Sequence, residues 1–207
     1  MKKICLLTMG LALMTVTAFA APQTDIQQGK TSVDLGIFNS KTALNDEDFN
    51  TKSNIDAGIT TGLSDKYAIQ YKYHGLESGN DKYGYGDSTD INTQEFNVLY
   101  KLTPTTDAFV GLHRIAGSID SEDIDAKNKV QVGITSKVPL SKEVSAWGTV
   151  AAGSDLVTFE AGLSHPLSQS ADLNVYYHYT KDDDLRINGD KFDFENNGFG
   201  LGVTMKF

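Results

Sequence analysis

Strict alternation of apolar and polar residues is the feature that most constrains this chain. Stretches of about ten residues alternate near 32–37, 54–63, 67–74, 95–102, 129–138, 157–164, 173–180 and 198–207. Successive side chains of a β-strand point to opposite faces, so a period of two predicts strands with one apolar and one polar face. Turn residues separate the stretches, as expected for antiparallel hairpins. The sequence therefore predicts an all-β, up-and-down antiparallel fold.

Two further stretches read as strands but leave their apolar face undecided. In Ala108–Ile115 and Val144–Ala152, either set of alternate positions is apolar enough to form the outer face. Trp147 points outward in one assignment and inward in the other. Counting both stretches gives ten strands, and eight remain if this pair does not span.

The connections between the predicted strands alternate in length. Short turns are expected at 64–66, 103–106, 139–143 and 166–172, and longer acidic connections at 40–51, 77–91, 117–127 and 181–196. Gly153–Leu156 is the one short connection on the second side. Bacterial outer-membrane barrels have short periplasmic turns and longer extracellular loops. An even number of strands places both chain ends on the periplasmic side.

The first twenty residues carry the pattern of an export signal. Lys2 and Lys3 precede an apolar run, Ile4–Phe19, and Ala18-Phe19-Ala20 supplies a cleavage motif. This three-part pattern is typical of a secretory leader. We therefore expect a cleaved signal peptide over 1–20 and one domain over 21–207.

Charge and cysteine content narrow the classes of function. Without the leader the chain keeps 16 basic and 27 acidic residues, a net charge of −11, and it loses its single cysteine. Disulfides and thiol chemistry are thereby excluded. An acidic chain without a basic cluster also argues against nucleic acid as a partner.

A soluble β-sandwich or lipocalin-like barrel is the main alternative fold. Such a protein buries its apolar face, whereas here that face carries tyrosines near the strand ends, and the opposite face is rich in glycine with scattered charges. Tyrosines at strand ends are typical of the aromatic girdles of membrane barrels. The pattern favours a transmembrane β-barrel.

The end of the chain resembles a known family. Its apolar positions recur at every second residue and finish on an aromatic: Phe199, Leu201, Val203, Met205 and Phe207. This pattern is similar to the terminal strand of bacterial outer-membrane β-barrel proteins. The resemblance implies a location in the cell outer membrane, with these five residues as an assembly signal. It also implies lipid, lipopolysaccharide, the barrel assembly machinery and periplasmic chaperones as partners.

Inward-facing polar residues are the candidates for a site. Pairing across the turn at 64–66 places Asp56 opposite His74, toward the extracellular end. An acid beside a histidine can orient an imidazole as a general base. Omptins, which are ten-stranded outer-membrane proteases, place such a pair at that level, although no local omptin motif surrounds these residues. The alternative is a lumenal network of buried charges that satisfy one another, comprising Asp56, His74, Glu95, Lys129, Glu160 and His178.

Three other motifs favour no specific chemistry. Ser164-His165 adjoins a predicted periplasmic turn, the wrong end for an enzyme acting on outer-leaflet lipid. Asp184–Glu195 departs from the calcium-loop pattern because Arg186 stands where a ligand oxygen belongs. Acidic clusters at 46–48, 120–125 and 182–184 suit solvated loops. We expect no cofactor, no metal and no catalytic residues.

The function expected from the sequence is that of a porin-like outer-membrane barrel. It would act as a narrow channel or as a structural or surface-binding protein, without catalysis. An omptin-like enzyme is the alternative. Because small barrels fill their interior with side chains, we expect little or no conductance.

Overall fold

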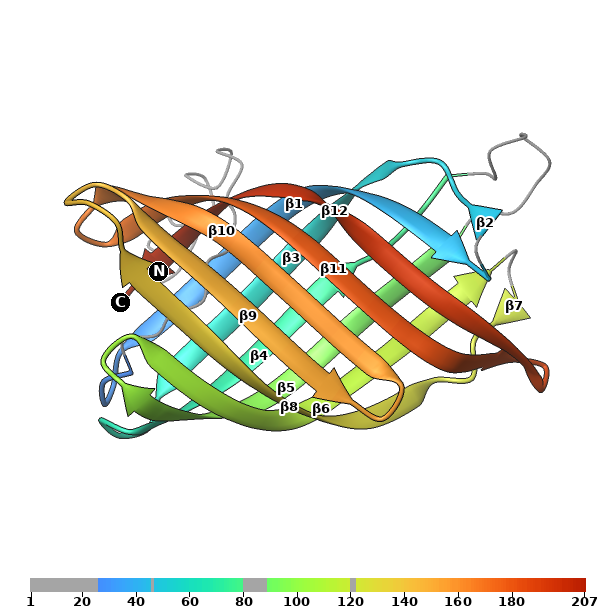
Figure 1. The fold of residues 1–207 in the computed structure, drawn as a ribbon, viewed down its shortest axis with the longest axis horizontal. Helices are drawn as coiled ribbons and strands as arrows, with labels where there is room; N and C mark the ends of the chain where they lie inside the picture. Colours follow the sequence, from blue (N-terminus) through green and yellow to red (C-terminus); the bar gives the residue numbers. More distant parts are fainter. Residues whose placement is uncertain (1–25, 46, 80–88, 120–121) are drawn as a thin grey trace, which may run out of the picture.

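Ten long antiparallel strands form a closed barrel in the computed structural model of the chain (Figure 1). The structure describes residues 26–45, 47–79, 89–119 and 122–207. The predicted leader, 1–20, lies outside the described residues. The strands are β1 (Thr31–Leu44), β3 (Lys52–Gly62), β4 (Tyr67–Gly75), β5 (Thr89–Thr103), β6 (Thr106–Ile119), β8 (Lys127–Pro139), β9 (Ser145–Gly153), β10 (Leu156–Ser168), β11 (Ala171–Ile187) and β12 (Asp190–Lys206).

Each long strand pairs with the next long strand in the sequence, and the last closes on the first. β12 pairs with β1 over the register Ser32↔Lys206 to Leu44↔Phe194. Two short strands lie outside this path: β2 (Glu47–Asp48) pairs with β1, and β7 (Glu122–Asp123) pairs with β6. The up-and-down topology and the count of ten are thus confirmed.

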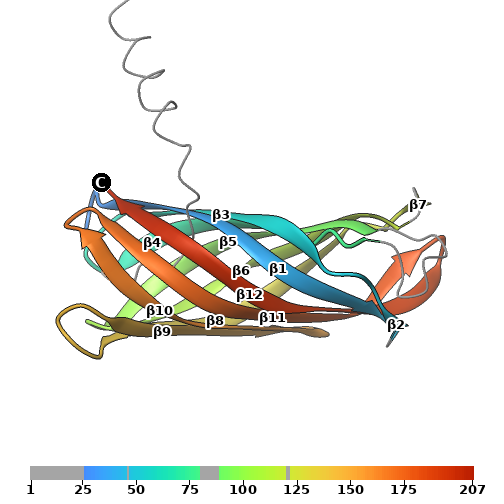
Figure 2. The same ribbon diagram turned by 90° about the horizontal axis from the view of Figure 1, so that it is seen from above.

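The two ends of the barrel differ in their connections. Short turns at 63–66, 104–105, 140–144 and 169–170 share one end with Phe207, and we call this the turn end. The opposite end, here the loop end, carries β2, β7 and residues 76–79. Figure 2 shows β11 and β12 reaching far along the barrel toward the loop end.

The prediction of a long acidic connection over 181–196 is wrong. β11 and β12 pair through this region, and only Asn188 and Gly189 remain as the turn. Both have positive φ, 52° and 92°, as a two-residue hairpin turn requires. The pairing is possible because Leu185, Phe192 and Phe194 all point inward and are buried, so apolar burial holds the hairpin together.

The outer surface is a band of apolar side chains. Val132 is 58% exposed and Val150 53%, and similar values hold around the barrel for Val110, Leu112, Val130, Ile134, Leu163, Val175 and Phe199. Exposure of so many large apolar side chains costs about 25 cal/mol per Å² in water but nothing comparable in hydrocarbon. This surface is therefore the lipid-facing side of a transmembrane barrel.

The structure also settles the two stretches whose faces the sequence left open. Val110 and Leu112 point to lipid, while Phe109 and His113 point into the lumen. Trp147 points inward and is 6% exposed. The described residues contain no helix long and apolar enough to span a bilayer.

Apolar clusters fill both ends of the interior. Leu76, Ile91, Ile115, Leu185 and Phe194 belong to a cluster that fills the loop end and reaches inward to Trp147 and Tyr176. A smaller cluster combines Ile26, which precedes β1, with Ala68, Leu99, Phe109 and Ala151. Buried polar side chains, among them Asp56, Glu95 and Glu160, occupy other parts of the interior.

A charge on the lipid-facing band should destabilise the barrel according to its depth. Val132 lies in the middle of the outer face of β8, and Asn128 lies on the same face near the loop end. We expect Val132→Arg to lower the free energy of unfolding by about 2–4 kcal/mol and Asn128→Arg by at most about 1 kcal/mol. Urea titration in vesicles, followed by heat-modifiable gel mobility, measures both. Equal losses would contradict the assignment of this face.

Candidate functional site in the lumen

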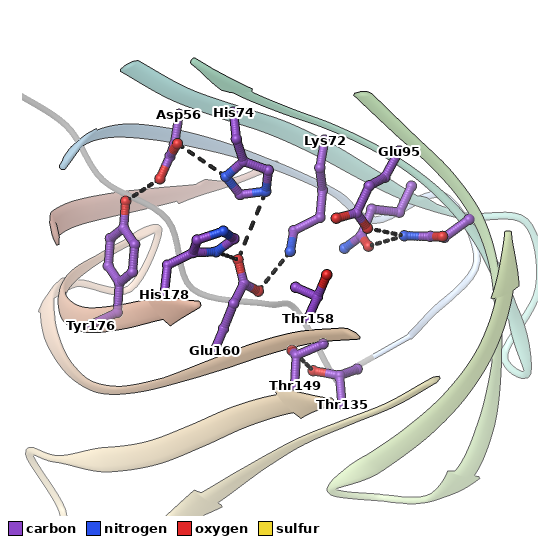
Figure 3. A network of polar contacts seen from close by, with 12 residues as sticks. Asp56, Lys72, His74, Glu95, Thr135, Thr149, Thr158, Glu160, Tyr176 and His178 are labelled. Atoms are coloured by element: carbon purple, nitrogen blue, oxygen red, sulfur yellow. Dashed lines mark hydrogen bonds and ion pairs between the residues drawn. The ribbon is translucent and has the colours of Figure 1, made fainter. Parts of the chain in front are cut away.

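The candidate site is a set of buried polar side chains that meet in the middle of the lumen (Figure 3). They come from strands on opposite sides of the barrel, chiefly β3, β4 and β5 on one wall and β10 and β11 on the other. The period of two points each of them inward, because their neighbours in sequence occupy the lipid-facing band.

Asp56 receives two side-chain hydrogen bonds. Asp56 lies opposite His74 in the β3–β4 ladder, and the His74 Nδ1–H donates to Asp56 Oδ1 over 3.0 Å. The Tyr176 hydroxyl donates to Asp56 Oδ2 from across the lumen. Asp56 and His74 are 2% and 4% exposed. The carboxylate therefore fixes the orientation of the imidazole, and Nε2 is directed into the lumen.

Glycine makes room for the tyrosine. A Cβ on Gly200 would lie 2.3 Å from the Tyr176 ring, and one on Gly36 would lie 2.6 Å from the Asp56 Cβ. The glycines of the inner face thus serve close packing at these positions, a point that the sequence leaves open.

Glu160 is the second centre of the site. Its Oε1 accepts a hydrogen bond of 3.2 Å from His178 Nδ1 and lies 3.8 Å from His74 Nε2. Its Oε2 accepts from the Lys72 ammonium at 2.6 Å. Glu160 is on β10 and Lys72 on β4, so this ion pair crosses the lumen.

A third group surrounds Glu95. Its Oε2 accepts hydrogen bonds from Asn97 Nδ2 at 3.0 Å and from Gln131 Nε2 at 2.9 Å. His113 Nδ1 lies 3.8 Å from Glu95 Oε1. Gln131 on β8 and Glu95 on β5 again join non-adjacent strands.

Lys129 does not join the other five residues that the sequence groups with it. Its ammonium binds Asp182 Oδ1 at 2.5 Å and the carbonyl oxygens of Asp155 and Asp183 at 2.8 and 2.9 Å. Lys129 lies near the loop end of β8, so the nearest acceptors are the β9–β10 turn and β11. The structure brings together Asp56, His74, Glu160 and His178, with Glu95 beside them.

The site also differs in position from the expected extracellular rim. Leu76 follows His74 by two residues and is fully buried in the loop-end cluster, together with Ile91, Ile115 and Phe194. The Asp56–His74 pair therefore lies beneath an apolar layer. The cavity beside it, lined by Asp56, His74, Glu160, Tyr176 and others, measures about 20 Å³, enough for one water.

Three members of the site were not singled out by sequence reasoning. The only sequence signal for Tyr176 and His113 is that they occupy alternate positions that point into the lumen. For His113, the sequence leaves open which alternate positions point inward. Lys72 pairs with Glu160, which is 88 residues away in the sequence. Contacts across a lumen depend on barrel closure and tilt, which local patterns do not encode.

Two places bear on metal binding. Potential ligand atoms of His74, Glu160 and His178 lie within 4.8 Å of one another, and all three residues are buried. In the region that resembles a calcium loop, the Asp184 carboxylate instead accepts a hydrogen bond of 2.7 Å from Lys191. That hydrogen bond lowers the pKa of Asp184 below its ordinary value.

The fold and the lumen define a small integral barrel of the bacterial outer membrane. The family model described as "Outer membrane protein beta-barrel domain" matches residues 9–207, and the chain belongs to this family. It is accordingly a protein of the outer membrane. No curated protein sequence matches the chain.

Solved structures of outer-membrane proteins align with the chain. The outer membrane protease OmpT from Escherichia coli aligns with a TM-score of 0.57 at 11% identity, covering 89% of this chain and 100% of OmpT. Neisserial surface protein A aligns with a TM-score of 0.47 at 14% identity, covering 87% and 100%. OprG from Pseudomonas aeruginosa gives 0.37 at 12% identity, covering 90% and 99%. At 11% identity, the likeness to OmpT is one of fold alone.

Removal of the Lys72 ammonium should destabilise the barrel strongly. Lys72→Met leaves Glu160 buried without its cationic partner, which costs about 3–5 kcal/mol for a buried pair. Lys66→Met, on the exposed turn between β3 and β4, is the matched control and should change little. Urea midpoints in detergent micelles measure the difference. Equal stability of the two variants would show that the ion pair does not support the fold.

Proposed function

We propose that this chain is a non-catalytic outer-membrane barrel with a sealed lumen, which acts as a structural and surface-binding element. The observation that carries the proposal is the filling of the lumen at three successive levels. An apolar cluster fills the loop end, charged and polar pairs cross the middle, and a second apolar cluster lies toward the turn end.

The turn end is closed by the segment before β1. Ile26 is buried among Leu99, Phe109 and other apolar side chains, and its carbonyl oxygen accepts a hydrogen bond of 3.0 Å from Lys101 Nζ. Backbone hydrogen bonds from Gly29 N to the Gly62 carbonyl and from Gly62 N to the Lys30 carbonyl, both of 2.9 Å, hold the segment against β3. The Lys101 ammonium, which could otherwise line a channel, thereby holds the segment at Ile26 inside the turn end.

The loop end supports a surface role. The β11–β12 hairpin is tied to the neighbouring connections: Asp125 N donates to the Arg186 carbonyl over 2.9 Å, and Asn188 Nδ2 donates to Glu122 over 3.1 Å. Asn45 and Asp193 exchange hydrogen bonds on the other side of the hairpin. These contacts would present a fixed surface outside the membrane, in place of loops that fold over a pore.

The enzyme alternative has one observation in its favour, the Asp56–His74 hydrogen bond. An imidazole held by a carboxylate is a suitable general base only where a substrate can reach it. Here both residues are nearly inaccessible, and Tyr176 occupies the second carboxylate oxygen. A peptide cannot enter a cavity of about 20 Å³. The geometry favours the sealed barrel.

Planar-bilayer recording tests the seal directly. The refolded chain, shown to be folded by heat-modifiable mobility, should give no reproducible conductance steps, because side chains block each level of the lumen. A large porin recorded under the same conditions serves as the positive control. Regular cation-selective steps from the folded chain would overturn the proposal.

Substitution of His74 separates the structural and catalytic interpretations. His74→Gln removes the imidazole that lies between Asp56 and Glu160, and it should lower the temperature at which the barrel unfolds on gels. His165→Gln, at an exposed position near the turn end of β10, should leave that temperature unchanged. Incubation with peptide mixtures should show no cleavage by any form. Cleavage by the wild type that His74→Gln abolishes without loss of heat resistance would favour an enzyme.

A further inference from the structure

The side chains of His74, Glu160 and His178 come from opposite walls of the barrel and converge on one point. We propose that they form a binding site for a single divalent transition-metal ion of the Zn²⁺ type. His178 Nδ1 lies 3.2 Å and His74 Nε2 3.8 Å from the same oxygen, Glu160 Oε1. Tetrahedral ligands about 2.0–2.1 Å from zinc are separated from one another by about 3.3 Å. These two separations are close to that value, and the ligand atoms of all three residues lie within 4.8 Å of one another.

Asp56 prepares His74 for this role. Metal-binding histidines usually donate their second ring N–H to a carboxylate, which fixes the tautomer and the ring orientation. The His74 Nδ1–H donates to Asp56 Oδ1 at 3.0 Å, which places the lone pair of the neutral ring on Nε2. Within the described part of the chain, Nε2 is buried and has no hydrogen-bond partner. A buried nitrogen aimed at a carboxylate without a hydrogen bond is a position that a cation would satisfy.

The charges of the site are unbalanced without a cation. Asp56, Glu95 and Glu160 face one ammonium, that of Lys72, so with neutral histidines the group carries two uncompensated negative charges. Uncompensated buried charge is costly. Lys72 binds Glu160 Oε2, which leaves Oε1 directed at the two histidines. One divalent ion at that position balances the group.

The ligand types indicate which ions fit. Imidazole with a carboxylate is a set typical of zinc and similar transition metals, whereas Ca²⁺ and Mg²⁺ prefer oxygen ligands alone. On binding, the neutral His178 ring changes tautomer: its proton moves from Nδ1 to Nε2, and the ion takes the proton's place at Nδ1, because the neutral imidazole is the form that binds a metal. The adjoining cavity of about 20 Å³ has room for one water as a fourth ligand.

Such an ion would join β4 to β10 and β11, two strands with which β4 does not pair in the sheet. His74 is on β4, while Glu160 and His178 are on β10 and β11. The metal would therefore act as a structural link across the lumen, independent of whether the barrel conducts.

Binding of Co²⁺ to the full mature chain tests the site, because Co²⁺ takes the place of Zn²⁺ and its visible absorption reports coordination geometry. The chain is refolded with Co²⁺ or treated with it after folding in chelator, and excess metal is removed. We expect one tightly held equivalent per barrel with the absorption of a four-coordinate ion, and a higher unfolding temperature than that of the metal-free barrel. A folded wild-type chain that retains no metal by either route would overturn the proposal.

Variants locate the ion. His178→Gln and Glu160→Gln should lose the bound equivalent, and Asp56→Asn should weaken affinity about 10–100-fold by releasing the His74 ring. His165→Gln, which replaces an exposed histidine, should retain the metal. Loss of binding in His165→Gln alone would show adventitious surface binding and overturn the site. If a ligand variant does not fold, the wild-type stoichiometry and the affinity of Asp56→Asn decide.

Discussion

The ion pair between Lys72 and Glu160 is the interaction on which the interior of this barrel depends. It joins β4 to β10 across the lumen, and its carboxylate also receives His178 and lies next to His74. A barrel whose outer face is apolar has no outer surface on which to place such groups within the membrane. The charges must be satisfied inside, and each strand contributes through its inward positions.

This arrangement explains why the lumen is closed. Ion pairs and hydrogen bonds that cross the interior occupy the space through which solutes would pass, and apolar clusters fill both ends. The same contacts tie opposite walls together, which a sheet closed by backbone hydrogen bonds alone does not do. A sealed barrel and a buried metal site are compatible, since an ion bound during folding needs no permanent path.

The strand pattern predicted the fold because each face of a membrane strand has its own composition. The alternation did not identify the lipid-facing side where both faces of a strand are apolar. In β6, Phe109 and Ile115 point inward while Val110 and Leu112 point to lipid. The β11–β12 extension was mistaken for a loop because its outward residues are mostly charged. Its inward Leu185 and Phe194 carry the strand pattern.

The Asp56–His74 pair could be predicted because a short turn fixes the register of a hairpin. The residues that contact this pair from other strands could not be predicted. Tyr176, Glu160 and His178 reach the pair from strands far away in the sequence, through the tilt and closure of the whole barrel. For the same reason Lys129 was grouped wrongly: its depth along β8 brings it to Asp182 near the loop end.

A double-mutant cycle on Lys72 and Glu160 tests most directly whether the cross-lumen pair holds the interior together. The free energies of unfolding of Lys72→Met, Glu160→Gln and the double variant would be compared with that of the wild type by urea titration in vesicles. A direct pair predicts that the double variant loses less stability than the sum of the single variants, by more than about 1 kcal/mol. Additivity within about 0.5 kcal/mol would contradict the account, because the two residues would then act independently.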